Sequence, residues 1–351
     1  MRCQRWGMGN SRGRGTETSA VCPGASSVAV VLVLVACLLV CACHRLPRNS
    51  AHLVVLVPKL VGIPYFNAAR DGAQQAAQQL GLQLLYTGPT SADAGLQVEV
   101  LDGLLARHPG VLAVSCDDPN AVTPVLRRAR RYGIHVLTWD SNAQPGTAEW
   151  FVNQVDPERL GRHVMDVLAA EMGGKGKFAI ITGALTASNL NEWLGWMKRE
   201  RAERFPQMDL VTVVAANDDQ QLAFVQAQQL LQAYPDLGGI IGNSSAAVPA
   251  AAQAVEQAGK AGQVAVTGLS TPDLMRRYVM DGTVKTVTLW DPGKLGALTV
   301  QVAAQVMRGE TPTDGMNIPG VGPVQVIAAS HTIIIGPPLD FTQANIGQYH
   351  F

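Results

Sequence analysis

The hydrophobic positions of this chain form short apolar runs that alternate with longer amphipathic segments. The first run, residues 53–57 (LVVLV), is typical of a strand buried on both faces of a parallel sheet. Alanines then recur at helical spacing between 69 and 77. We expect Asn67 to cap the start of this helix and Gly81 to end it. The pattern therefore opens with a strand, a loop and a helix.

The same alternation continues through the chain. After the first unit, strands are expected at 83–87, 111–115 and 134–139, and a short crossing strand at 151–154. A second series of strands follows at 178–182, 210–215, 239–242, 263–268 and 284–290. Repeated strand–helix units predict parallel sheets with helices on both faces. The fold class is therefore α/β, with two doubly wound parallel-sheet lobes joined by a multi-stranded hinge.

The pattern also predicts the domain boundaries. We assign residues 1–43 to a leader and 44–51 to a linker. The N-terminal lobe is expected at 52–148, completed by about 292–325, and the C-terminal lobe at 149–290, completed by about 326–351. Ligands bind beyond the carboxyl ends of the strands in such sheets, and domain interfaces are preferred ligand sites. The cleft between the lobes is therefore the expected binding site.

The leader has the order of a secretory signal, with arginines followed by an apolar run at 28–42. That run is shorter than the roughly 20 residues of a membrane span. Two cysteines end lipobox-like motifs: Cys37 has the better motif, and Cys43 is favoured because the chain turns polar directly after it. An uncleaved anchor helix and a start at Met8 stay open. We expect a lipid-anchored protein of the periplasm or cell envelope.

Composition narrows the function classes. Hydrophobic residues make up 47% of the chain, charged residues 15%, and the formal net charge is zero. The sequence has no basic run interleaved with aromatics, so a nucleic-acid partner is not expected. Of the six cysteines only Cys116 lies after the leader. We therefore expect no disulfide framework and no metal site built on thiolates.

Two other functions are disfavoured by missing motifs. Residues 58–62, which follow the first strand, lack the Gly-x-Gly-x-x-Gly turn of a dinucleotide-binding enzyme. The chain has neither a Gly-x-Ser-x-Gly elbow nor a His-Glu-x-x-His motif. A transcription regulator would carry a DNA-binding domain where the leader stands. We expect a binding protein that is not an enzyme and needs no cofactor.

Several motifs together carry a resemblance to a known family. They are VPKLVG at 57–62, LTWDS at 137–141, NQ at 153–154, VPAAAQ at 248–253, GLSTP at 268–272, GTV at 282–284, LWD at 289–291 and QANIG at 343–347. With them the chain resembles, from residue 53 to the end, periplasmic solute-binding proteins of the ribose-binding type. These serve ABC importers. It is most similar to the branch that binds rhamnose and autoinducer-2 (AI-2).

The resemblance implies a type I periplasmic-binding-protein fold, hinge closure on a small sugar, a membrane permease as partner and a monomeric state. AI-2 receptors use a lysine after the first strand and an aspartate in the Trp-Asp-Ser motif, positions held here by Lys59 and Asp140. Their Asp-Gln pair is replaced by Asn189-Leu190, and their Pro-Asp-Ala loop by residues 243–245. A rhamnose-like sugar is therefore the first expectation, and AI-2 is the alternative.

Sugar recognition needs paired donors and acceptors for hydroxyl groups, and aromatic faces for the C–H surface. The candidate ligand-binding residues are Lys59, Tyr65, Phe66, Asp118, Asp140, Asn153, Gln154, Asn189, Asn191, Asn243, Ser244, Trp290 and Asp291. Each has a structural alternative, such as a helix cap for the aspartates, turn chemistry for the amides or hinge packing for Trp290. Trp193 and Trp196 are expected in the core. Whether the bound form serves a permease or a sensory receptor stays open.

Overall fold

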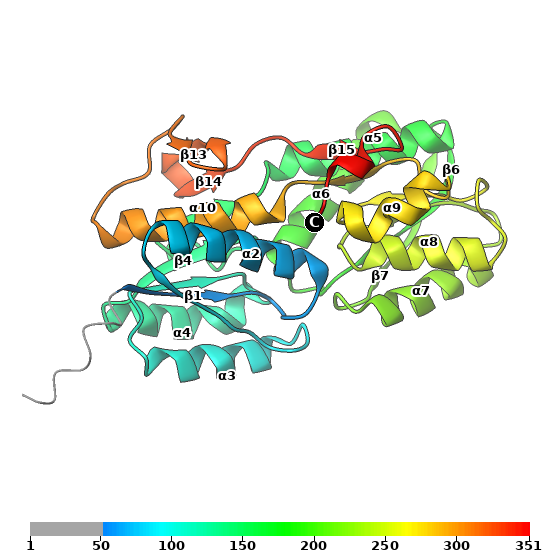
Figure 1. Ribbon diagram of the computed structural model, residues 1–351. Coiled ribbons are helices and arrows are strands. Elements are labelled where there is room, and N and C mark those ends of the chain that lie inside the picture. Colours follow the sequence, from blue (N-terminus) through cyan, green and yellow to red (C-terminus); the bar gives the residue numbers. More distant parts are fainter. Residues whose placement is uncertain (1–51) are drawn as a thin grey trace, which may run out of the picture. The chain divides into compact units, whose positions relative to one another are not determined.

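The computed structural model describes residues 52–351. The predicted leader, with Cys37 and Cys43, lies outside the described residues. Nearly all of the described chain consists of two sheets with helices on both faces of each (Figure 1). The predicted fold class, two doubly wound α/β lobes, is confirmed.

The N-terminal lobe is built on a seven-stranded sheet with the order β13-β14-β5-β4-β3-β1-β2. All neighbouring strands are parallel except β13 and β14. The apolar run that opens the fold is a central strand of this sheet, which explains why it lacks polar positions. The strands are β1 Leu53–Val57, β2 Gln83–Tyr86, β3 Val111–Val114, β4 His135–Trp139, β5 Trp150–Asn153, β13 Gln325–Ile327 and β14 Thr332–Ile334.

Two helix layers cover this sheet. Helices α3 (Ala94–Leu105) and α4 (Pro119–Arg131) lie on one face, and α2 (Pro64–Gln79) and α10 (Pro292–Met307) lie on the other (Figure 1). The contact between α2 and α10 is very close, because a Cβ atom on Gly296 would collide with the main chain of Ala69. Glycine is therefore required where these two helices meet.

The C-terminal lobe has a four-stranded parallel sheet with the order β7-β6-β8-β9. Helices α5 and α6 pack together on one side, and α7 and α8 pack together on the other. The elements are α5 Pro157–Met172, β6 Gly176–Thr182, α6 Ser188–Arg204, β7 Met208–Ala215, α7 Gln220–Ala233, β8 Leu237–Gly242, α8 Ala247–Gln257, β9 Ala265–Gly268 and α9 Pro272–Met280.

The chain passes between the lobes after β5, after β10 (Val287–Leu289) and after β14. Strand β10 pairs antiparallel with β15 (Leu339–Phe341), so two of these segments are held side by side. A short hairpin of β11 (Asn317–Ile318) and β12 (Gly322–Pro323) follows α10. Three crossings of the chain lie between the lobes. Together they form a hinge that can bend while each lobe keeps its own structure.

The structure corrects two of the expected lobe boundaries. Strand β5 pairs with β4 in the N-terminal sheet, so the first lobe extends past residue 148 to Asn153. Strand β14 also joins this sheet, beside β5, although 326–351 was expected in the C-terminal lobe. The reason is that a strand-like apolar run does not reveal which of two sheets it will join.

The start of α2 is also corrected. The helix begins at Pro64, with Ile63 in extended conformation before it and no side-chain cap, so Asn67 lies inside the first turn. Proline suits the first position of a helix because an N–H at this position has no acceptor within the helix, so nothing is lost when proline lacks it. The predicted end holds, since Gly81 adopts a left-handed conformation directly after the helix.

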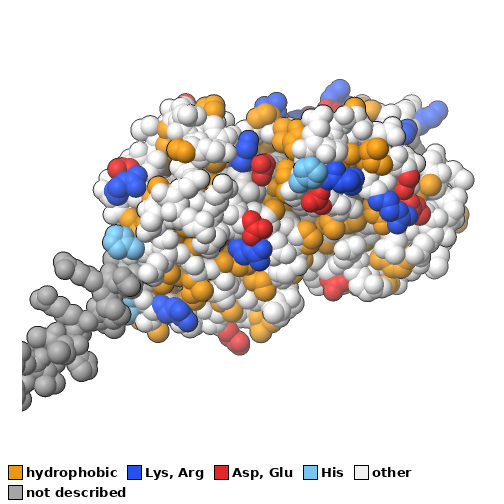
Figure 2. Space-filling view, viewed as in Figure 1, with side chains coloured by type: hydrophobic (Ala, Val, Ile, Leu, Met, Phe, Trp, Pro, Cys, Tyr) orange, Lys and Arg blue, Asp and Glu red, His pale blue; other side chains and the backbone are white. Residues whose placement is uncertain are grey.

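The visible surface is mixed in charge. On the face shown in Figure 2, basic and acidic side chains are interspersed rather than gathered into separate patches. In the part of the chain from 52 to 351, no helix combines the length and apolar character that a bilayer crossing requires.

Candidate ligand-binding site

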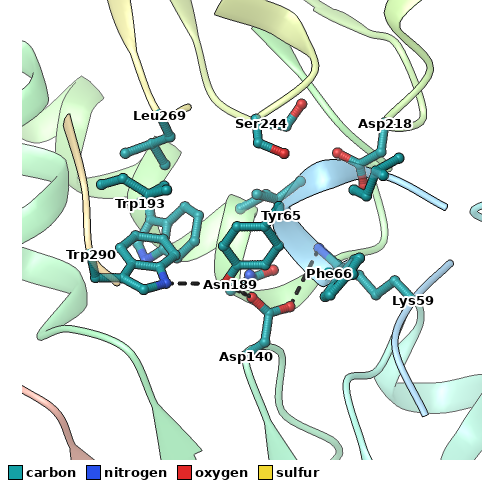
Figure 3. A pocket seen from close by; sticks show the side chains of 14 residues that line it. Lys59, Tyr65, Phe66, Asp140, Asn189, Trp193, Asp218, Ser244, Leu269 and Trp290 are labelled. Carbon is teal, nitrogen blue, oxygen red and sulfur yellow. Dashed lines mark hydrogen bonds and ion pairs between the residues drawn. The ribbon is translucent and has the colours of Figure 1, made fainter. Parts of the chain in front are cut away.

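A small cavity lies where the carboxyl ends of the strands in both lobes face each other (Figure 3). Both lobes and the β10–α10 crossing supply its walls. The lining residues are Lys59, Ile63, Tyr65, Phe66, Asp140, Asn189, Leu190, Trp193, Asp218, Ser244, Ser245, Leu269, Leu289 and Trp290.

Asp140 is the centre of the N-terminal half of the site. It follows β4 directly and has φ +61°, a left-handed conformation that aspartate tolerates better than most residues. Its carboxylate accepts hydrogen bonds from Tyr65 Oη at 2.8 Å and Ser115 Oγ at 2.6 Å. Gln154 Nε2 lies 3.4 Å from it. Asp140 is 2% exposed as a whole residue, and these hydrogen bonds orient its carboxylate toward the cavity.

Lys59 supplies the positive charge of the site. It is only 4% exposed, and its Nζ lies 3.9 Å from Asp140 Oδ2. Burial by itself would lower the pKa of Lys59, but the negative charges of Asp140, Asp218 and Asp117 outweigh this effect and raise it. Lys59 is therefore a buried cation at neutral pH, compensated by carboxylates from both lobes.

Aromatic side chains form the apolar part of the wall. Tyr65 Oη donates to Asp140 and accepts a hydrogen bond from Trp290 Nε1 at 3.1 Å. The Tyr65 and Trp290 rings meet edge to face with centroids 6.0 Å apart, and Trp193 lies 5.6 Å from Trp290. Burial and the neighbouring Asp140 raise the pKa of Tyr65 well above its usual value, so the hydroxyl stays a donor. These rings form an apolar wall that hydrogen bonds of Tyr65 connect to Asp140 and Trp290.

The C-terminal half of the site presents buried polar atoms that have no hydrogen-bond partner within residues 52–351. Asn189 lies in the first turn of α6, Asp218 follows β7 and Ser244 follows β8. Asn189 Oδ1, Asp218 Oδ2 and Ser244 Oγ are buried and make no hydrogen bond with any residue from 52 to 351. Such atoms are uncommon in folded proteins because leaving them unpaired is costly. Their grouping around one cavity points to a polar ligand.

Hydrogen bonds join the two lobes beside the cavity. Thr186 Oγ1 donates to the main-chain oxygen of Asp117 at 3.1 Å, and Ser188 Oγ donates to the main-chain oxygen of Asn142 at 3.1 Å. Ser188 Oγ also lies 3.2 Å from Ser141 Oγ. These contacts connect Thr186, in the loop before α6, and Ser188, the first residue of α6, to loops that follow strands of the N-terminal lobe, so the lobes are held together around the cavity.

Seven of the predicted site residues line the cavity, and six do not. The seven are Lys59, Tyr65, Phe66, Asp140, Asn189, Ser244 and Trp290. Three of the others have local structural roles. Asp118 caps α4, Asp291 caps α10, and Asn191 is exposed and donates to the main chain of Leu185.

The remaining three predicted residues lie buried outside the cavity wall. Gln154 reaches toward Asp140, and Asn153 is part of β5. Asn243 donates from Nδ2 to Thr182 Oγ1 at 3.1 Å and to the main chain of Leu190 at 3.0 Å. Asn243 and Gln154 therefore support residues that do reach the cavity.

The structure also adds lining residues that the sequence did not single out. Asp218 follows the end of a strand in a polar run, the same signal that identified Asp140. Trp193 was expected in the core, and it is buried, but it also forms part of the cavity wall. Helical spacing cannot distinguish these two environments. Leu269 and Leu289 lie in motifs that carry the family resemblance, and Leu190 and Ser245 lie where the chain departs from the AI-2 receptor pattern, but none of the four was predicted as a site residue. Ile63 carries no distinctive sequence signal.

The arrangement is suited to holding a ligand. Within residues 52–351 no group of three or more His, Cys, Asp or Glu side chains is placed to hold a metal ion. Cys116 is buried, and burial raises the pKa of its thiol, which keeps it protonated and unreactive. The fold and the cavity together define a class, a two-lobed binding protein with its ligand site between the lobes.

Comparison with known proteins identifies the family. A family model described as a periplasmic binding protein domain matches residues 54–311, and the chain belongs to this family. Among curated relatives, the ribose import binding protein RbsB of Salmonella typhimurium is 27% identical over 265 residues, covering 73% of this chain and 85% of that protein. The predicted resemblance to the ribose-binding type is confirmed, and these relatives are transport binding proteins rather than enzymes.

Two solved structures are similar over most of the chain. LsrB from Clostridium saccharobutylicum, in complex with AI-2, has a TM-score of 0.80 and 28% identity, covering 85% of this chain and 100% of that chain. An ABC transporter solute binding protein from Clostridium phytofermentas with bound L-rhamnose has a TM-score of 0.80 and 27% identity, covering 85% and 97%. Both branches named by the sequence resemblance are therefore structural neighbours.

Proposed function

We propose that the protein is the extracytoplasmic sugar-binding component of an ABC importer and binds a small rhamnose-like sugar in the cavity between its lobes. One observation carries this proposal. The cavity combines an aromatic wall with buried polar atoms, on Asn189, Asp218 and Ser244, that lack hydrogen-bond partners among the described residues. A ligand with several hydroxyl groups and an apolar C–H face satisfies both surfaces.

In this proposal the N-terminal half recognises hydroxyl groups by charge. Lys59 donates to a hydroxyl oxygen, and Asp140 accepts from a neighbouring hydroxyl group. Hydrogen bonds with a charged partner are roughly twice as strong as neutral ones. Trp193 and Trp290 cover the C–H surface of the sugar. No bond of the ligand is made or broken.

Ligand binding is coupled to closure of the lobes. The hydrogen bonds of Thr186 and Ser188 across the cleft exist only when the lobes are close together. The sugar adds contacts to both lobes and favours this closed arrangement, because it binds the open form through only one of them. The closed form is then read by a membrane permease, as the family relatives named as import binding proteins suggest.

The choice of ligand follows from the C-terminal half. Asn189 stands where the resemblance places an acid in AI-2 receptors, which favours a neutral rhamnose-like sugar. AI-2 is the alternative, since Lys59 and Asp140 match the receptor pattern and LsrB with AI-2 is a structural neighbour. Delivery to a sensory receptor instead of a permease would use the same cavity.

The experiment that tests this function is calorimetric titration of the purified protein. The panel contains L-rhamnose, further deoxy sugars, D-ribose, D-arabinose and AI-2. We expect one of the neutral sugars to bind with saturable heat at one site per chain. Absence of binding across the whole panel would contradict the sugar proposal, and binding of AI-2 alone would support the alternative.

We further propose export and lipid anchoring of a monomer through Cys43, with Cys37 as the alternative. Cells expressing Cys43→Ser or Cys37→Ser are fractionated and compared with wild type. Replacing the lipidated cysteine is expected to release the protein from the membrane fraction. If neither variant is released, the anchoring proposal fails, whereas the sugar site is unaffected.

A further inference from the structure

We infer that Asp218 is a specificity-determining ligand contact of the C-terminal lobe, and that with Asp140 it restricts the cavity to uncharged polyhydroxy ligands. This inference rests on the proposed sugar-binding function. Asp218 lines the cavity, is 6% exposed, and its Oδ2 has no hydrogen-bond partner in the part of the chain that the structure describes. Figure 3 shows its carboxylate on the side of the cavity opposite Asp140, with the Lys59 side chain from the other lobe nearby.

A purely local role does not account for the burial of Asp218. The neighbouring Asp219 caps α7, accepting a hydrogen bond from the Leu222 N–H at 2.8 Å. Asn217 and Asp218 both have positive φ, +49° and +56°, in the turn between β7 and α7. The turn therefore directs one aspartate to the helix and the preceding one to the cavity.

The packing of the C-terminal lobe leaves a defined place for this carboxylate. A Cβ atom added to Gly183, which follows β6, would come within 2.6 Å of Asp218 Oδ1 and 2.7 Å of Leu190 Cδ1. A side chain at position 183 would therefore push the carboxylate out of its place. We assign Gly183 as a positioning residue that allows Asp218 to lie against the β6 strand end.

The charges of the lining residues define the ligand class. Lys59 is the only cation among them, and Asp140 and Asp218 are the anions, so their formal sum is +1 − 2 = −1. Asp117 lies outside the cavity wall, but its negative charge also raises the pKa of Lys59. A sugar phosphate or sugar acid would bring a negative charge into this buried, net-negative site, and like charges at low dielectric repel strongly. A neutral polyol donates its hydroxyl hydrogens to the same carboxylates.

The test compares Asp218→Asn with the matched control Asp219→Asn. Both remove one negative charge from adjacent positions, and asparagine tolerates a left-handed conformation and also caps helices. The titrant is the neutral sugar that binds the wild-type protein, together with its anionic counterpart, for example D-ribose and D-ribose 5-phosphate. Unfolding of each variant without ligand shows whether it is folded.

We expect Asp218→Asn to weaken binding of the neutral sugar at least about tenfold, as loss of a hydrogen bond to a charged group does, while Asp219→Asn binds as wild type. Gly183→Ala should weaken binding as well, and should cause no further loss when combined with Asp218→Asn. The wild-type protein should show no binding of the anionic counterpart.

Three results separate the possible failures. Wild-type affinity in Asp218→Asn overturns the assignment of Asp218. Equal binding of the neutral sugar and its anionic counterpart by the wild-type protein overturns the charge-based selection. A wild-type protein that binds no neutral sugar at all overturns the proposed function itself.

Discussion

We expect Asp140 both to stabilise the ligand-free protein and to contact the ligand. Replacing Asp140 tests both roles. Its carboxylate lies 3.9 Å from the buried Lys59 ammonium and accepts hydrogen bonds from Tyr65 and Ser115. At an effective dielectric constant of about 20, two charges at this separation attract by about 4 kcal/mol. Removing one partner of a buried pair typically costs about 3–5 kcal/mol, because the other charge is left uncompensated.

For Asp140→Asn we expect a loss of about 3 kcal/mol in the free energy of unfolding, at the low end of that range. Asp117 and Asp218 still compensate part of the Lys59 charge. For Asp140→Ala the loss should be about 1–2 kcal/mol larger, because alanine is strained in the left-handed conformation at φ +61° that this position requires.

The assay is urea unfolding of the ligand-free protein at pH 7, followed by tryptophan fluorescence. Asp291→Asn is the control, since it removes a carboxylate that caps α10 outside the cavity, and asparagine can replace it as a cap. Unfolding of Asp140→Ala at the wild-type urea concentration would refute the pairing of Lys59 with Asp140. Sugar binding by either variant at wild-type affinity would refute its role as a ligand contact.

Three further predictions concern the surroundings of the site. Tyr65→Phe leaves Trp290 Nε1 without its acceptor, so the free energy of unfolding should fall by about 1–3 kcal/mol. In a double-mutant cycle, Trp290→Phe should cost less stability in the Tyr65→Phe background than in the wild-type protein. Burial raises the pKa of Asp117 from 3.8 to about 6. The folded state thus binds this proton more tightly than the unfolded chain, and stability should fall as the pH rises from about 4 through about 6. The urea midpoint of Asp117→Asn should not fall over this pH range. If the variant and the wild-type protein show the same pH dependence, the raised pKa of Asp117 is contradicted. Gly296→Ala should force α2 and α10 apart and cost about 1–3 kcal/mol, whereas a stability equal to wild type would contradict the close contact with Ala69.

The N-terminal half of the site could be predicted from sequence because its residues directly follow buried strands. Lys59 follows β1 and Asp140 follows β4, and strand ends of a parallel sheet meet at one edge. Asp218 also follows its strand, β7, although it was not among the predicted site residues. The strand-end rule alone would have found it.

Other parts of the site depend on facts that the sequence pattern does not carry. Asn189 and Asn191 both lie in the first turn of α6, but two residues along a helix amount to about 200° of rotation. One therefore faces the cavity and the other faces solvent. The apolar residues of β5 and β14 likewise do not show which lobe these strands complete, because both sheets accept the same residue types.

The central claim is that one small neutral sugar lies in the cavity between the two lobes. The most direct test is a crystal structure of the protein with the sugar that binds in the calorimetric panel. We predict that the sugar is enclosed by both lobes, with hydroxyl groups at hydrogen-bond distance from Asp140 and Asp218 and its C–H face on Trp193 or Trp290. A sugar bound elsewhere, or in this cavity without contact to either aspartate, would contradict it.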